Sequence, residues 1–228
     1  MERKSCFRLG MMIVASTVLA LGSAHRAQAT TITGALTADN AFFAYLSTSN
    51  TSLGTLIAQG NDWPSTFNFT DIALTPGQTY YLQIEAINYG GPGAIIGQFT
   101  LSDSGFQFAN GTSTLLTDTT DWLAIYNDAN SDPNTAQPWV TPTGGVISEG
   151  TNGVGPWGTK SGISASADWI DAANNGLSIC QNCTADFSTT ITSASSGVPE
   201  PGTLTLLLGA LSIASFLAVR RLKTAQDS

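Results

Sequence analysis

Carboxylates and tryptophans are the side chains in this sequence that could do chemistry. The only histidine, His25, lies near the N-terminus, in a segment that we expect to be removed. Without an imidazole, the rest of the chain can build neither a Ser-His-Asp nor a Cys-His catalytic arrangement, and no histidine-ligated metal site. Carboxylate chemistry remains, as in sugar hydrolysis, together with the binding of an oxygen-ligated cation such as calcium.

Acidic and aromatic residues in predicted turns are the candidates for binding a ligand. Their oxygens could hold calcium or sugar hydroxyls, and an indole ring could stack on a sugar. The candidate set is Asp39, Asn40, Asp62 and Trp63. Three further tryptophans lie in or near loops: Trp122, Trp139 and Trp157. For each tryptophan the alternative is packing inside the protein. We expect no required cofactor, and calcium is the one candidate.

Glycoside hydrolysis would need two carboxyl groups at a defined separation. Glu85 and Glu149 are the only glutamates between residues 30 and 196, and they form no spaced pair. We therefore expect that the protein is not an enzyme.

Cys180 and Cys183 form a C-x-x-C pair. In a cytosolic protein this spacing would suggest redox chemistry or half of a zinc site. No second pair and no histidine is present to complete four zinc ligands, and an exported chain is expected to be oxidised. We predict a disulfide whose stabilising effect is modest, because the loop it closes is short.

The charge of the central segment is strongly one-sided. Between residues 30 and 196 a single basic residue, Lys160, stands against thirteen acidic residues, which gives a net charge of about −12. Because nucleic-acid binding depends on neutralising phosphates with lysine and arginine, this composition argues against a nucleic-acid partner.

The N-terminus has the layout of a secretory signal peptide. Basic residues at positions 3, 4 and 8 precede a mostly apolar segment, residues 9–21, and Ala27 and Ala29 form a small-x-small cleavage site. The alternative is a permanent N-terminal anchor. We predict a signal helix within residues 1–29, handled by the Sec translocon and signal peptidase, and a mature chain that starts at Thr30.

The body, residues 30–196, has the pattern of an all-β domain. Short β-branched and aromatic runs are separated by turn residues, and no long helical periodicity is present. Pro76 and Gly77 predict a type II turn between two strands. Residues 110–160 are expected to form long loops over a few short strands. The predicted strands are 31–36, 41–48, 65–74, 79–88 and 94–103, followed by a closing hairpin of 165–172 with 184–193.

Residues 37–99 resemble one half of the galactose-binding-like, jelly-roll β-sandwich. The shared features are an acidic turn, a tryptophan-containing turn (Trp63), a Pro-Gly turn and a strand that ends in N-Y-G-G-P. The resemblance implies a jelly-roll-like β-sandwich. Many members of this superfamily bind sugars and others are structural, so the fold alone does not decide between the two.

The C-terminal segment contains an apolar run with a basic end. Residues 204–219 are 16 positions without a charge, about 24 Å as a helix, against a hydrocarbon core of about 30 Å. Arg220, Arg221 and Lys223 follow and should stay cytoplasmic. We predict a single C-terminal transmembrane helix, for which the simpler interpretation is a plain tail anchor.

Pro199, Glu200 and Pro201 directly precede this helix. The order of Pro-Glu-Pro, apolar helix and basic end resembles the PEP-CTERM sorting signal, here residues 197–223. The resemblance implies processing by an exosortase in an exopolysaccharide-producing Gram-negative bacterium. The protein would be anchored transiently in the inner membrane and then reach the cell surface or extracellular matrix.

These observations leave two main expectations for the body. One is a carbohydrate-binding-like module that associates with exopolysaccharide. The other is a purely structural surface or biofilm protein without a small ligand. A glycoside hydrolase is the least favoured alternative.

Overall fold

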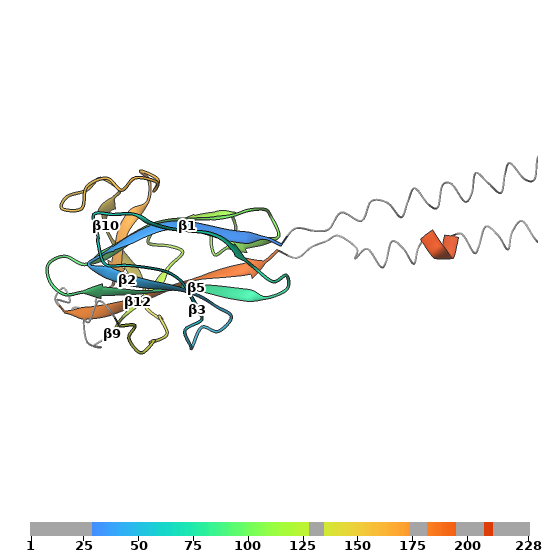
Figure 1. Cartoon of the computed structure of the whole chain (residues 1–228), viewed down its shortest axis with the longest axis horizontal. Coiled ribbons are helices and arrows are strands. Elements are labelled where there is room, and N and C mark those ends of the chain that lie inside the picture. The colour runs from blue at the N-terminus through green and yellow to red at the C-terminus, as the bar shows by residue number, and fades with distance from the viewer. Residues whose placement is uncertain (1–28, 128–134, 174–181, 195–207, 212–228) are drawn as a thin grey trace, which may run out of the picture. The chain divides into compact units, whose positions relative to one another are not determined.

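The computed structural model describes residues 29–127, 135–173, 182–194 and 208–211. Within these ranges the chain forms twelve strands in two antiparallel sheets, which lie as two layers (Figure 1). All the strands belong to one compact unit, Ala29–Ser195. The described residues of the unit Ala29–Ser195 are therefore all-β, as the sequence predicts.

Sheet A has β1 (Thr31–Asp39) and β6 (Ala94–Leu101) at its centre, paired along eight residues of each strand. β8 pairs with β6 on the side that β11 also contacts. In spatial order the sheet contains β10 (Val146–Thr151), β11 (Asp168–Ala172), β6 (Ala94–Leu101), β1 (Thr31–Asp39) and β4 (Phe67–Ala73), with β8 (Thr114–Leu116) beside β6.

Sheet B is centred on β5 (Thr79–Asn88) and β12 (Cys183–Ser193), whose ladder runs from Cys183 opposite Asn88 to Thr192 opposite Thr79. On its other side β12 pairs first with β9 and then with β7. In spatial order the sheet contains β3 (Thr55–Gly60), β2 (Ala41–Ser47), β5 (Thr79–Asn88), β12 (Cys183–Ser193) and β7 (Phe106–Phe108), with β9 (Leu123–Asn127) beside β12.

The main hydrophobic core lies between the sheets. Alternation along each strand turns one set of side chains inward, such as Leu82, Ile84 and Ala86 of β5. From the other sheet Phe99 meets Trp122, with their ring centres 5.7 Å apart. Burial of these large apolar side chains is the main stabilising contribution that the sequence pattern supplies.

The outer faces of both sheets are also covered. On sheet B, Phe43 and Tyr45 belong to a second apolar cluster, so every residue of β2 is buried. On sheet A, Ile96 and Trp169 belong to a third cluster. Long loops provide this cover, in agreement with the loop-rich interpretation of residues 110–160.

Two local predictions are confirmed and one is wrong. Gly77 has φ of 81° in the predicted Pro-Gly turn, and Gln78 N donates to Thr75 O at 3.3 Å. β11 and β12 form within the expected ranges, but they do not form a hairpin: β11 pairs with β10 and β6 in sheet A, whereas β12 belongs to sheet B. The chain changes sheets between them.

Residues 1–28 of the predicted signal peptide, including Ala27, lie outside the described residues, as do the Pro-Glu-Pro motif and the basic end of the tail. Of the apolar run, residues 208–211 are described and are helical. No helix in the described part of the chain is long and apolar enough to cross a membrane.

Candidate functional site

Lys160 is buried among tryptophans on the outer side of sheet A. Its ammonium nitrogen lies 4.6 Å from the ring centre of Trp63 and 5.7 Å from that of Trp169. Trp157 stacks on Trp169 with ring centres 4.7 Å apart and planes 19° from parallel. Ammonium groups over indole faces at such distances gain cation–π attraction. We call these four residues the tryptophan–lysine cluster.

Asp39 places a carboxyl group beside this cluster, where it interacts with Trp157 and with the charge of Lys160. Trp157 Nε1 donates to Asp39 Oδ2 at 2.9 Å. Burial raises the pKa of Asp39, while the Trp157 hydrogen bond and the charge of Lys160 oppose that rise. Burial lowers the pKa of Lys160, and the carboxylates of Asp39 and Asp62 oppose it. The place that a bound cation would take beside these two acids is taken by the protein's own ammonium group.

The position of Lys160 is fixed by one buried amide. Asn152 Oδ1 accepts from Lys160 N at 2.7 Å, and its Nδ2 donates to Lys160 O at 3.0 Å and to Ile163 O at 2.9 Å. The turn-rich segment between β10 and β11 is thereby folded back over the sheet, which brings Lys160 to Trp63, about a hundred residues earlier in the sequence.

The candidate residues from the sequence are only partly brought together. Asp39, Asp62 and Trp63 surround Lys160, but Asn40 Oδ1 accepts from Tyr89 N at 2.9 Å instead. Asp62 Oδ2 accepts from the hydroxyl of Ser65. These four residues therefore interact with other groups of the protein itself. The single lysine in an otherwise acidic body was the one feature of the sequence that could have indicated such internal contacts.

The other tryptophans have the packing role that was the alternative to sugar stacking. Trp122 and Trp157 are 2% and 5% exposed. Trp139 is half-buried, and its Nε1 donates to Asn50 O at 3.0 Å. Trp122 and Trp157 therefore present no open indole face to a sugar.

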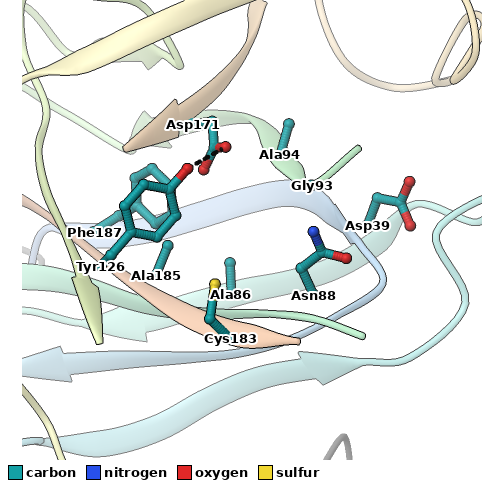
Figure 2. Close-up of a pocket in the computed structure, with 10 residues that line it drawn as sticks. All are labelled: Asp39, Ala86, Asn88, Gly93, Ala94, Tyr126, Asp171, Cys183, Ala185 and Phe187. Carbon is teal, nitrogen blue, oxygen red and sulfur yellow. Dashed lines mark hydrogen bonds between the residues drawn. The ribbon is translucent and has the colours of Figure 1, made fainter. Parts of the chain in front are cut away.

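A small internal pocket lies between the two sheets, near the turn that joins β1 to β2 (Figure 2). Its volume of about 10 Å³ is close to what one water molecule needs. Tyr126 and Asp171 point toward each other across it, with the phenol donating to Asp171 Oδ2 at 2.7 Å. Burial raises the pKa of Asp171 to about 6 and raises the pKa of Tyr126 well above its usual value. This pocket is too small for an organic substrate.

Cys183 also lines this pocket and is disulfide-bonded. Cys180, its partner in the sequence-based prediction, lies outside the described residues.

A larger hollow opens where β12 changes its edge partner, and we call it the β12 hollow. β9 pairs with β12 up to Ser188 and β7 pairs from Ile191 onward, so Thr189 and Thr190 have no ladder partner on that side within the described residues. The hollow has a volume of about 300 Å³. Its lining residues are Asn50, Tyr81, Ala109, Thr120, Asp121, Trp122, Leu123, Ser188, Thr189 and Thr190.

The side chains that line the β12 hollow are suited to binding a ligand by hydrogen bonds and ring contacts. It offers hydroxyls, an amide, the half-buried ring of Tyr81 and one carboxyl, Asp121, whose pKa is raised by burial and by neighbouring Asp118. Neither glutamate of the body lines it: Glu85 is buried in sheet B, and Glu149 is exposed on β10 of sheet A. No local sequence pattern predicts this hollow, because it depends on which strands flank β12.

Comparison with protein-family models, curated proteins and solved structures yields no match for this chain. In the described part of the chain, no three histidine, cysteine or acidic side chains gather as a metal-binding group.

Proposed function

We propose that this protein is an exported surface or extracellular-matrix protein whose β-sandwich binds exopolysaccharide at the β12 hollow. The observation that carries the proposal is the gap in the edge pairing of β12. It leaves backbone groups of Thr189 and Thr190 beside hydroxyl side chains and the ring of Tyr81. Sugars present hydroxyls for such groups and an apolar ring face for an aromatic side chain.

The fold supports the proposal in a general way. The chain crosses repeatedly between the sheets, with β1, β4 and β6 in one and β2, β5 and β12 in the other. This arrangement suits a jelly-roll-like sandwich, a fold for which sugar binding is frequent but not general.

The destination is proposed from the sequence of the two ends. The signal peptide would direct the chain to the Sec translocon and signal peptidase, and Pro199, Glu200 and Pro201 would present the tail to an exosortase. Prolines remove backbone donors and disfavour helix, so this motif would stay extended outside the membrane segment.

The binding proposal can be tested by titrating purified exopolysaccharide of the producing cells into the full chain in a calorimeter. Tyr81→Ala and Asp121→Asn should each weaken binding, by about tenfold for the loss of an aromatic contact. Tyr89→Ala is the matched control, because Tyr89 is 43% exposed but follows the opposite end of β5. Binding that is equally strong in all four proteins would refute the assignment to this hollow.

A second candidate is a structural surface protein without a small ligand. The burial of Trp122, Trp157 and Trp169 favours it, because three of the five tryptophans serve packing. Deletion that changes biofilm texture, together with no measurable glycan affinity, would support this alternative.

A further inference from the structure

Two carboxyl groups face each other on the outer side of sheet B. Glu85 of β5 lies directly opposite Asp186 of β12 in the ladder, and both are 0% exposed. Side chains at such paired positions project to the same face with Cβ atoms about 5 Å apart. We call Glu85 and Asp186 the acid pair.

Each member of the acid pair has one oxygen satisfied and one not. Glu85 Oε2 accepts from the Tyr45 hydroxyl at 3.0 Å, and Asp186 Oδ2 accepts from Val140 N at 2.9 Å and Asn127 Nδ2 at 3.3 Å. Glu85 Oε1 and Asp186 Oδ1 are buried without a hydrogen-bond partner of good geometry in the described structure, and only the nearby backbone N–H of Gln137 adds to the Tyr45 contact in lowering the pKa of Glu85. A buried carboxylate oxygen without a partner is costly and calls for an explanation.

More unpartnered oxygens lie on the same two strands and in the loop above them. Gln83 and Thr184 are each two residues from a member of the acid pair and so project to the same face. Gln83 Nε2 donates to Ser49 O and Ser52 O, which leaves its Oε1 without a partner. Thr184 Oγ1 and the Oδ1 of Asn50 are also buried without partners.

No basic side chain of the body compensates this negative charge. Lys160 is the only lysine or arginine between residues 30 and 196, and its contacts are with Trp63 and Trp169. Burial raises the pKa of both carboxyls to about 7, which reflects the cost of holding them ionised in this place. The unpartnered groups found here are all oxygens, with no nitrogen or sulfur ligand among them.

We propose that Glu85 and Asp186 bind a divalent cation of calcium-like chemistry beneath the 135–141 segment. Calcium takes carboxylate, amide and hydroxyl oxygens at six to eight positions, whereas zinc and copper favour nitrogen and sulfur. Two carboxylates balance the charge of one such ion. Because no third acidic residue gathers with them among the residues that the structure describes, neutral oxygens such as Gln83 Oε1 and Thr184 Oγ1 would complete the coordination.

The covering segments explain what the ion would stabilise. Trp139 Nε1 and the Thr141 hydroxyl both donate to Asn50 O, at 3.0 and 3.2 Å, so the 135–141 segment is joined to the loop between β2 and β3. Val140 N is bonded directly to Asp186. An ion on the acid pair would therefore fasten this segment to sheet B. The candidate set around Asp39 lies elsewhere, with its carboxylates already beside Lys160.

The test uses the purified full chain, stripped with EGTA and refolded with or without CaCl2. We expect one terbium ion to bind per chain, with luminescence sensitised by the nearby Trp139 and Tyr45, and to be displaced by calcium. We also expect calcium, at concentrations well above its Kd, to raise the Tm by several degrees. Magnesium, which keeps its waters more firmly, should do so less.

Variants test whether the terbium signal and the calcium-dependent rise in Tm come from the acid pair. Glu85→Gln and Asp186→Asn should abolish the terbium signal and the calcium-dependent rise in Tm. Thr184→Val, a smaller change that keeps the fold, should weaken terbium affinity even where the carboxyl variants fail to fold. Asp171→Asn is the matched control: it removes another buried carboxyl, whose two oxygens are already bonded to Tyr126 and Ala172 N, and should leave the response unchanged.

Three outcomes would overturn the proposal. The first is no terbium signal and no calcium effect on the wild-type Tm. The second is a response that survives in folded Asp186→Asn protein or is unchanged in Thr184→Val. The third is a rise in Tm for Glu85→Gln without any metal response in the wild type, which would mean that the acid pair is held by a proton and not by an ion.

Discussion

Lys160 shows how one residue can change the meaning of several others. Asp39, Asp62 and Trp63 have types and spacing suited to a cation or sugar site. In the folded protein an internal ammonium group occupies their centre, 3% exposed and 4.6 Å from the ring centre of Trp63. The carboxylates thus have an electrostatic role within the fold, and the aromatic faces are covered.

Replacing Lys160 should separate the contribution of its charge from that of its stem. Lys160→Ala removes both, leaving Asp39 without its cation and opening space beside Trp63 and Trp169. We expect a loss of about 2–4 kcal/mol in the free energy of unfolding, measured by urea denaturation with tryptophan fluorescence. Lys160→Met keeps the apolar stem and should lose less, about 1–2 kcal/mol. A methionine variant as stable as the wild type would show that the charge contributes nothing.

The raised pKa of Asp171 predicts how the stability of the protein depends on pH. Its pKa is about 6 in the folded protein, raised by burial and by Glu149 and lowered by its bonds from Tyr126 and Ala172 N. In the unfolded chain an aspartate has a pKa of about 3.9. Between these values the folded state holds the extra proton, so raising the pH from about 4 to 6 removes stability.

Asp171→Asn should abolish that part of the pH dependence. The variant cannot ionise, so its stability relative to wild type should improve by on the order of 2–3 kcal/mol between pH 4 and pH 7. Denaturant titrations across this range provide the measurement. Asp103→Asn serves as the control: the Thr30 hydroxyl and Gly105 N lower the pKa of Asp103, so its contribution to stability changes near and below about pH 4 and should stay nearly constant from pH 5 to pH 7. A stability difference between Asp171→Asn and wild type that does not change with pH would contradict the assignment.

At the scale of elements, the sequence predicts most strands but not all their partners. Alternation in residues 79–88 correctly gives β5 with Leu82 and Ile84 inward. β3 was not predicted, because it is half-exposed and its apolar residues do not alternate clearly. The prediction that β11 and β12 form a hairpin was wrong. Alternation of apolar and polar residues shows only that a strand has one buried face, and strands of two different sheets can both show it.

Burial of polar residues was the hardest feature to predict. Glu85 occupies the position of an outward-facing residue in an alternating strand, where an exposed carboxylate would be ordinary. It is buried because segments distant in sequence cover sheet B, with Trp139 bonded to Asn50. No local pattern carries that information, and the same holds for the meeting of Lys160 with Trp63.

Gly34 gives a test of packing at the centre of sheet A. A Cβ added there would lie 2.5 Å from the ring of Phe69 and 2.7 Å from that of Phe99, closer than real Cβ atoms approach. Gly34→Ala should therefore destabilise the protein by about 1–3 kcal/mol, seen as a lower midpoint in thermal or urea unfolding. At Gly145 an added Cβ meets nothing within 4 Å, so Gly145→Ala should stay within about 0.5 kcal/mol of wild type. Equal effects of the two changes would argue against this close packing.

At the scale of the whole molecule, the charges of the chain are divided between the body and the ends. One lysine and thirteen acidic residues lie between residues 30 and 196, while the other seven basic residues lie before or after. In a chain that keeps both ends, basic segments would be tethered to a strongly acidic body. Removal of both ends would leave an unbroken acidic surface, which favours solubility and repels anionic lipid.

This division makes the ends of the chain the most informative measurement of its proposed destination. We expect intact-mass spectrometry of protein recovered outside the cells to give a chain that begins at Thr30 and ends near Pro199–Pro201. That chain lacks Arg220, Arg221 and Lys223, so its isoelectric point should lie below the value of about 4.3 for the whole sequence.

A variant with Pro199→Ala and Pro201→Ala should restore backbone donors and helix propensity at the motif, and so should hold the chain in the membrane fraction with its tail intact. The glycine variant Gly145→Ala, within the body, should be released like the wild type. Recovery of full-length tails outside the cell, or equal release of the alanine variant, would mean that the Pro-Glu-Pro motif is not the processing signal and that the apolar run is a plain anchor.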